Sequence, residues 1–173
     1  MEKINYIWGL LRLSMGWIFF WAFIDKLFGL GFATCRDASA NLVDILCEKA
    51  WLSGGSPAFG FLKFAAKGPF AEFYQGLAGN PIVDWLFMAG LFGVGAALLL
   101  GIGVKIAGYS GVFMMLFIYT AGFILPQNNP FLDEHFVYAM IMIGLILSHS
   151  GRWLGFGRWW KNTQLVQKFP ILE

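Results

Sequence analysis

Long uncharged stretches constrain this chain more than any other feature of its sequence. Twenty residues without a charge separate Asp84 from Lys105, and 27 separate Lys105 from Asp133. A third apolar run, broken by one histidine, lies between His135 and Arg152. A helix needs about 20 apolar residues to cross the hydrocarbon core of a bilayer. These stretches therefore predict membrane-spanning helices over residues 82–102, 105–125 and 131–150.

A fourth apolar segment opens the chain and carries charges. It runs from about residue 4 to residue 31 and contains Arg12, Asp25 and Lys26. Its centre, residues 13–24, is strongly apolar. A signal peptide, cleaved near the small residues at 38–40, is the alternative interpretation. Signal peptides have a short apolar region after a basic start, so the long, charge-interrupted segment favours a true span.

Composition supports a membrane protein. The chain has 58% apolar residues and a mean hydropathy of +0.66, and only 13% of its residues are charged. Ordinary soluble domains contain fewer apolar and more charged residues. We expect an all-α integral membrane protein with a four-transmembrane-helix bundle. An extracytoplasmic cap over residues 32–80, containing short helices, completes a single domain of residues 1–173.

The distribution of Lys and Arg predicts the orientation. Basic residues gather near both termini and at Lys105, where the second and third spans meet. The positive-inside rule assigns such segments to the cytoplasm. We therefore expect a multi-pass protein of the cell (plasma) membrane with both termini cytoplasmic. The net charge of +2 is an orientation signal and does not indicate nucleic-acid binding.

The outer segment divides at residues 54–57. Residues 34–51 are expected to form a short helix, and the Phe-rich residues 58–79 an interfacial or re-entrant piece. Cys35 and Cys47 face an oxidising compartment in this topology, so we expect a structural disulfide, with a redox role as the alternative. Twelve residues along one helix would span about 18 Å, so pairing requires that helix to break.

Small residues recur at every fourth position of the second span. The stripe consists of Ala89, Gly93, Ala97 and Gly101. Such a stripe lets two helix backbones approach closely in lipid. It predicts helix packing within the bundle, and it also permits a homo-oligomer.

The two histidines do not predict a metal site. His135 and His149 lie about 21 Å apart along one helix, which is too far to bind one ion together. No haem, flavin or iron–sulfur motif is evident either. We expect no metal in this protein.

Ionisable residues near the outer ends of two spans form the candidate site. Asp25 and Lys26 lie near the outer end of the first span, and Asp133 and His135 open the last. The first helix runs outward and the last runs inward, so these residues are expected at one depth. Ionisable residues are costly in lipid and mark sites by default. We expect Lys26 and His135 to polarise or protonate a ligand while Asp25 and Asp133 orient them.

Each of these residues also has a structural interpretation. Lys26 can reach the outer interface by snorkelling, and Arg12 can anchor lipid headgroups at the inner face. Asp133 can sit at the start of a helix entered through Asn129 and a proline, where the dipole favours acids. Asp25 is the hardest to explain in this way, because an acid inside a span must be protonated or find a cation.

Motifs along nearly the whole chain carry a family resemblance. They are residues 11–17 (LRLSMGW), 26–27 (KL), 67–69 (KGP), 80–85 (NPIVDW), 128–135 (NNPFLDEH) and 151–152 (GR). These motifs resemble the DoxX superfamily, and more closely its DoxD-type branch, the membrane subunit of thiosulfate:quinone oxidoreductase. The Asn-Pro-x-x-Asp-x-His element at residues 129–135 is the most specific. The chain departs from the family pattern at Asp25, where a small residue is expected.

The resemblance implies a function. A DoxD-type subunit, with a separate partner called DoxA, oxidises thiosulfate to tetrathionate and passes electrons to quinone. Membrane lipid, a small sulfur anion and quinone are then the expected partners, and Arg12, Asn129, Lys26 and His135 are expected to bind the quinone. The alternative is a non-catalytic membrane scaffold of an oxidoreductase or sulfur-handling complex. Transport fits less well, because the helices lack paired Gly/Pro-broken halves.

Overall fold

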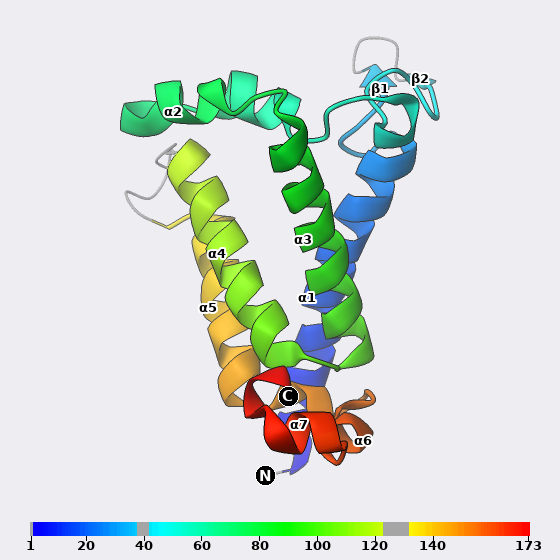
Figure 1. Cartoon of the computed structure of the whole chain (residues 1–173), viewed down its shortest axis with the longest axis vertical. Helices are drawn as coiled ribbons and strands as arrows, with labels where there is room; N and C mark the ends of the chain where they lie inside the picture. The colour runs from blue at the N-terminus through cyan, green and yellow to red at the C-terminus, as the bar shows by residue number, and fades with distance from the viewer. Residues whose placement is uncertain (1, 38–41, 123–131) are drawn as a thin grey trace. The chain divides into compact units, whose positions relative to one another are not determined.

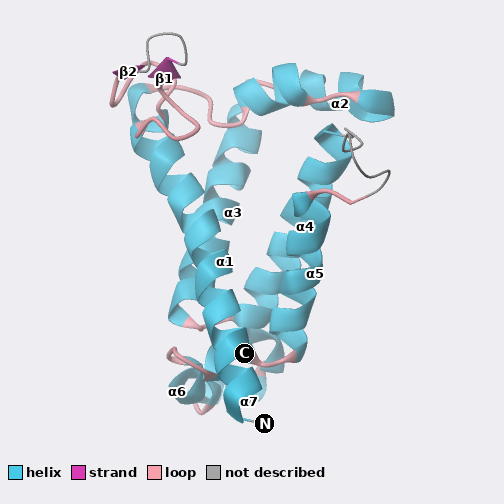
Figure 2. Cartoon of the chain, turned by 180° about the vertical axis from the view of Figure 1, so that it is seen from behind, coloured by secondary structure: helices cyan, strands magenta, loops and turns pink. Residues whose placement is uncertain are grey.

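The computed structural model describes residues 2–37, 42–122 and 132–173 (Figure 1). Its helices and strands are α1 (Glu2–Phe28), β1 (Arg36–Asp37), β2 (Leu42–Val43), α2 (Ala71–Gly76), α3 (Pro81–Leu100), α4 (Val104–Gly122), α5 (Glu134–Leu147), α6 (Gly157–Lys161) and α7 (Gln164–Lys168). Short helical turns join them at Trp51–Ser53, Phe61–Ala65, Gly68–Phe70, Ser150–Arg152 and Pro170–Leu172. Apart from one small hairpin, the regular structure of the described residues is helical (Figure 2).

Three helices of the described residues are long and apolar enough to cross a membrane. They are Lys3–Phe28 within α1, Pro81–Leu100 (α3) and Val104–Gly122 (α4). This result confirms that the predicted segments 4–31, 82–102 and 105–125 contain helices of spanning length. The charged residues of α1 do not interrupt the helix, and its mean hydropathy still reaches 1.6.

The predicted segment 131–150 forms a shorter helix. α5 is apolar but has 14 residues, whereas residues 131–150 were predicted. Asp133 has extended backbone and caps the helix, which therefore begins at Glu134. After Leu147 the backbone of His149 enters the left-handed region at φ 48°, and a helix cannot continue through that conformation. α5 is about 21 Å long.

Two compact units make up the chain. The first contains Met1–Phe19, Gly93–Tyr119 and Leu125–Glu173, and the second contains Phe20–Phe92 and Thr120–Ile124. The long helices α1 and α3 each contribute to both units. A single domain over residues 1–173 stays a prediction.

Close helix contacts build the first unit. A Cβ added at Gly16 of α1 would lie 2.9 Å from the backbone nitrogen of Leu99 in α3. A Cβ at Gly108 of α4 would lie 2.5 Å from Cγ1 of Ile146 in α5, and both views show α4 and α5 side by side (Figures 1 and 2). Both distances are shorter than real side-chain contacts. Glycine at these two positions therefore allows the backbones to approach, as small residues commonly do between membrane helices.

The cap in the second unit begins with a disulfide-closed hairpin. β1 and β2 pair antiparallel, with Arg36 opposite Val43. Cys35 and Cys47 form a disulfide with their Cα atoms 5.7 Å apart. The predicted disulfide is confirmed, whereas the predicted helix over residues 34–51 is wrong. The bond requires Cα atoms within about 7 Å, and a continuous helix would separate these cysteines by far more.

Short helices form the rest of the cap, as predicted. They are Phe61–Ala65, Gly68–Phe70 and α2. Tyr74 of α2 is buried, and its hydroxyl lies 2.7 Å from Oγ1 of Thr120 at the end of α4. Phe64 and Phe73 are more than half exposed on the same segment, while Leu62 is buried. A buried face opposite exposed aromatic side chains is typical of interfacial segments.

Candidate functional site

The start of α5 brings together Asp133 and His135, two residues of the predicted site. Oδ1 of Asp133 accepts a hydrogen bond from the backbone N–H of Phe136 at 3.0 Å, and Oδ2 lies 2.9 Å from Nδ1 of His135. The capping interpretation of Asp133 is confirmed, and the same carboxylate orients the imidazole. Asn129, the other predicted residue of this motif, lies outside the described residues.

This pairing determines which histidine nitrogen is available for chemistry. With the proton on Nδ1 directed to Asp133, Nε2 of His135 is the acceptor. Among the described residues, Nε2 has no hydrogen-bond partner. The side chains of His135 and Asp133 are 29% and 19% exposed, so the pair is not enclosed by the described residues. His135 is thus arranged to receive or deliver a proton at Nε2.

Aromatic surface adjoins this histidine along the chain. Phe136 follows His135, and its ring centroid lies 6.3 Å from that of Tyr119 in α4. The side chains of Phe136 and Val137 are also partly exposed. The first turn of α5 therefore carries both the imidazole and partly exposed apolar side chains.

The same turn contains three groups that can ligate a metal. The ligand atoms of Asp133, Glu134 and His135 all lie within 4.8 Å of one another, and Glu134 is exposed. The sequence argument considered only the pair of histidines and missed this grouping. Exposed acidic groups of this kind are common without an ion, and the N-cap and imidazole hydrogen bonds already explain Asp133.

Asp25 is held by backbone amides. Its side chain is 1% exposed, and its oxygens accept hydrogen bonds from the N–H groups of Phe32 at 3.0 Å and Ala33 at 2.9 Å. The chain reverses between these partners through Gly29 and Gly31, which have φ of 68° and 83°. Positive φ is readily available to glycine. From the sequence, protonation or a nearby cation was expected to compensate Asp25, and the two backbone amides were missed. The two glycines were the sequence signal for the turn that brings these amides to Asp25.

Lys26 presents the opposite case. It is partly buried, and within the described residues its Nζ makes no hydrogen bond or ion pair. An ammonium group without such a partner in an apolar helix is available to an anionic or polar ligand. Lys26 belongs to the second unit and His135 to the first, so their meeting at one ligand stays a prediction.

Arg12 is fully buried and serves the backbone. Its guanidinium donates to the carbonyl oxygens of Leu98, of Leu99 at 3.2 Å, and of Trp153 and Leu154 at 2.9 Å each. The last carbonyls of a helix such as α3 have no partner within the helix. Only Nε of Arg12 lacks a hydrogen bond. Arg12 therefore ties α1 to the end of α3 and to the segment after α5, which leaves a ligand only that one nitrogen.

Asp84, in the predicted 80–85 motif, has a comparable structural role. It is buried in the first turn of α3 and accepts hydrogen bonds from Oγ of Ser56 at 2.9 Å and the N–H of Ala58 at 3.1 Å. These bonds attach the cap segment to α3 within the second unit.

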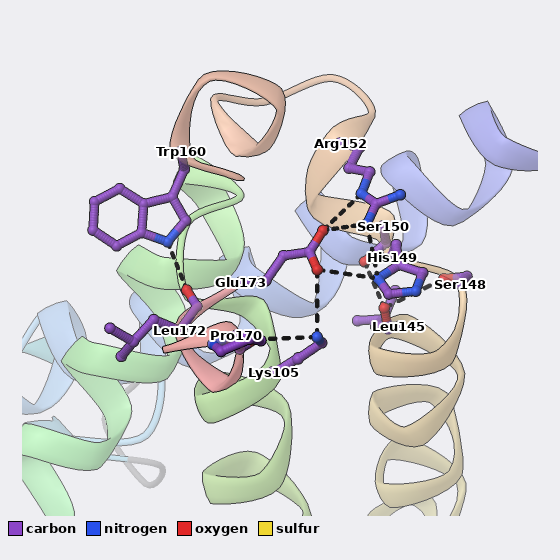
Figure 3. A network of polar contacts seen from close by, with 10 residues as sticks. All are labelled: Lys105, Leu145, Ser148, His149, Ser150, Arg152, Trp160, Pro170, Leu172 and Glu173. Carbon is purple, nitrogen blue, oxygen red and sulfur yellow. Dashed lines mark hydrogen bonds and ion pairs between the residues drawn. The ribbon is translucent and has the colours of Figure 1, made fainter. Parts of the chain in front are cut away.

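A polar cluster that sequence reasoning missed lies where α4 begins and α5 ends. The carboxylate of Glu173 faces the side chains of Lys105, His149 and Arg152 (Figure 3). Burial alone raises the pKa of Glu173, but the hydrogen bond and charge of Arg152, with Lys105 and His149, outweigh it and hold that pKa below its ordinary value. Burial and the charge of Arg152 lower the pKa of His149, and Glu173 opposes them only in part.

Known proteins give no match: no protein-family model, curated protein or solved structure is significantly similar to this chain. The resemblance to the DoxX superfamily therefore stays a prediction from the motifs.

Proposed function

We propose that this chain is the membrane subunit of a quinone-linked oxidoreductase of the DoxD type. Its substrate is thiosulfate or a related small sulfur compound. The observation that carries the proposal is the Asp133–His135 pair at the start of an apolar helix. Oxidation of two thiosulfate ions to one tetrathionate releases two electrons. A quinone accepts these two electrons and takes up two protons, and the role of this chain is to position the reactants and move the protons.

His135 fits the needs of a quinone head group. A quinone carbonyl requires a hydrogen-bond donor in an apolar surrounding, and His135 precedes Phe136, whose ring centroid lies 6.3 Å from that of Tyr119. With Nδ1 held by a carboxylate, Nε2 of the imidazole can take up a proton and donate it to a carbonyl, which suits general acid catalysis. The partial exposure of the pair supports access for a ligand from outside the protein.

Lys26 fits the needs of an anionic substrate. Thiosulfate is a dianion, so its site requires a cation that no acid has neutralised by direct contact. The neighbouring acid, Asp25, directs its oxygens to the amides of Phe32 and Ala33. Lys26 therefore keeps its ammonium group open to a ligand, although an acid adjoins it in the sequence.

The orientation belongs to the same proposal. We infer a multi-pass protein of the cell membrane in which α5 is a fourth spanning helix and both termini are cytoplasmic. The Cys35–Cys47 disulfide in the cap supports this orientation, because disulfides persist in oxidising compartments outside the cytoplasm. The basic residues near Lys105 and Arg152 support it independently.

The test is thiosulfate-dependent reduction of a soluble quinone analogue by the purified protein together with any co-purifying subunit. Loss of a general acid commonly costs about 100-fold in rate, and we expect a loss of that order in His135→Gln. We expect Lys26→Gln to raise the thiosulfate concentration needed for half-maximal rate. His149→Gln and Lys63→Gln are the matched controls and should keep full activity. Full activity in both site variants would overturn the proposal.

A second candidate function is a non-catalytic scaffold for an oxidoreductase complex. It is favoured by the structural hydrogen bonds of Arg12 and Asp25, which were both predicted as site residues. An obligate partner whose activity does not change in the His135 and Lys26 variants would establish this alternative.

A further inference from the structure

We propose that Lys105, His149 and Arg152 form an anion-binding site for a phosphate group, and that the carboxylate of Glu173 occupies this site as a built-in competitor. The phosphate belongs to an anionic lipid headgroup or is free in solution. This inference uses only the first unit and does not depend on the oxidoreductase proposal.

The contacts of Glu173 show how the site recognises an anion. Arg152 donates to Oε1 from Nε at 2.7 Å and also from Nη2. Lys105 Nζ lies 3.3 Å from Oε2, and His149 Nδ1 lies 3.7 Å from the same atom. Arginine directing more than one N–H to an anion, with lysine beside it, is the usual protein arrangement for carboxylate and phosphate.

The charge of the cluster favours a stronger anion than one carboxylate. Lys105 and Arg152 carry two positive charges, and among the described ion pairs of the cluster Glu173 supplies the only negative one. Lys161 adds positive potential at His149 without contacting Glu173. A phosphate with one or two negative charges would neutralise these cations at least as well as Glu173 does.

In a membrane crossed by α4, the cluster would lie at the depth where lipid phosphates occur. Lys105 is in the first turn of α4, a helix long enough to span a bilayer, and His149 and Arg152 follow the end of α5. Helix ends of this kind lie at the membrane surface, where basic residues attract anionic headgroups. The amino-terminal end of α4 adds a favourable helix dipole for an anion.

Glu173 ends a short segment that is attached through the buried side chain of Val166 in α7 and through three carbonyl hydrogen bonds. Lys105 binds the carbonyl oxygen of Pro170 through Nζ at 3.1 Å and that of Glu173 through its backbone N–H at 2.9 Å. Trp160 donates from Nε1 to the carbonyl of Leu172 at 2.6 Å. α7 and the following turn have five and three residues, too short to be stable as isolated helices. The segment can therefore leave the site when a competing anion binds.

The cavity at the cluster requires such a displacement. It is lined by Lys105, His149, Arg152 and Glu173 together with Gly101 and its neighbours, and its volume is about 10 Å³. A space of that size holds one water at most. A phosphate group therefore cannot bind beside Glu173, and has to replace it.

The first experiment measures binding to the full-length protein in detergent. The probes are phosphatidylglycerol in mixed micelles, phosphatidylcholine in mixed micelles, and inorganic phosphate, and the readout is the shift in thermal unfolding midpoint during titration. We expect Glu173→Gln to bind phosphatidylglycerol roughly tenfold more tightly than wild type, because one charged competitor is removed. The double variant Lys105→Gln/Arg152→Gln should lose this binding. Lys161→Gln, which removes an exposed cation at the same end, should stay within twofold of wild type.

The three probes distinguish the sources of the phosphate. Binding of phosphatidylglycerol that inorganic phosphate displaces indicates a general phosphate site, and binding that it leaves unchanged indicates a headgroup site. Equal affinity in wild type and Glu173→Gln would overturn the proposal. Equal losses in Lys161→Gln and in the double variant would also overturn it, because they would indicate diffuse attraction.

A second measurement uses only the wild-type protein and so does not depend on how a variant folds. Trypsin cleaves after exposed lysines, and Lys168 lies in the segment that must leave the site. We expect phosphatidylglycerol to speed cleavage at Lys168 at least threefold relative to phosphatidylcholine. Cleavage at an unchanged or slower rate would contradict the displacement.

Discussion

Replacing Asp25 by asparagine tests whether this acid is a structural cap or a catalytic group. Its carboxylate accepts hydrogen bonds from the N–H groups of Phe32 and Ala33. Hydrogen bonds to a charged group contribute about 1.5–3 kcal/mol each. In Asp25→Asn the amide oxygen can keep one of them as a neutral bond of about 1 kcal/mol, while its NH₂ group faces the other N–H. Burying a neutral amide costs less than burying a carboxylate, which offsets part of the loss. We therefore expect Asp25→Asn to lower the free energy of unfolding by about 2 kcal/mol.

The assay is denaturant unfolding of the purified protein in detergent, followed together with quinone reductase activity. Asp44→Asn is the matched control, because Asp44 is an exposed acid of the same cap. This control should unfold like wild type. The capping argument would be refuted if Asp25→Asn were as stable as Asp44→Asn and yet inactive, since the carboxylate would then act on the ligand and not on the turn.

Three further predictions follow from the structure. Arg12→Met should lower the unfolding free energy in detergent by about 3 kcal/mol, because one buried and three partly buried carbonyl oxygens lose their donor; unchanged stability would contradict the proposed tie. Reduction of the disulfide, or the double change Cys35→Ser/Cys47→Ser, should destabilise the protein by about 2–3 kcal/mol, and reductant should not shift the double variant further; a shift in that variant would mean that the effect of reductant has another origin. Folding lowers the pKa of both His149 and Glu173, so the unfolded state binds more protons and stability should fall on acidification. The first fall is expected as the pH drops through about 6.5, where His149 is protonated in the unfolded chain. The second is expected below about 4.3, where the Glu173 carboxylate is protonated. Unfolding midpoints between pH 7 and pH 3 should show a weaker dependence in the double variant His149→Gln/Glu173→Gln, and an identical dependence would rule out this origin.

The sequence alone determined which helices are long and apolar enough to cross a membrane. Whether a helix can cross a bilayer depends on its length and on the polarity of its own residues, and both are local properties. Three of the predicted spans therefore correspond to α1, α3 and α4, although α1 ends at Phe28 and not at residue 31. The predicted span 131–150 was too long at both ends, because of the Asp133 cap and the left-handed His149. The disulfide was also within reach of the sequence, because it follows from topology and cysteine count.

Only the tertiary structure decided what the charged residues do. Arg12 and Asp25 looked alike in the sequence, as costly ionisable groups inside an apolar helix. Arg12 binds backbone carbonyls and Asp25 binds backbone amides. Nearly every residue type carries these groups, so the sequence does not indicate which of them become the partners. Glu173 meets Lys105 across 68 residues of chain, a separation that no local pattern encodes. Asp133 binds Nδ1 of His135, and Asp25 binds backbone amides next to Lys26. The predicted role of His135 and Lys26 at a ligand stays a prediction. The cost of burying a charge can be read from one sequence position, whereas the group that compensates it is set by the folding of the whole chain.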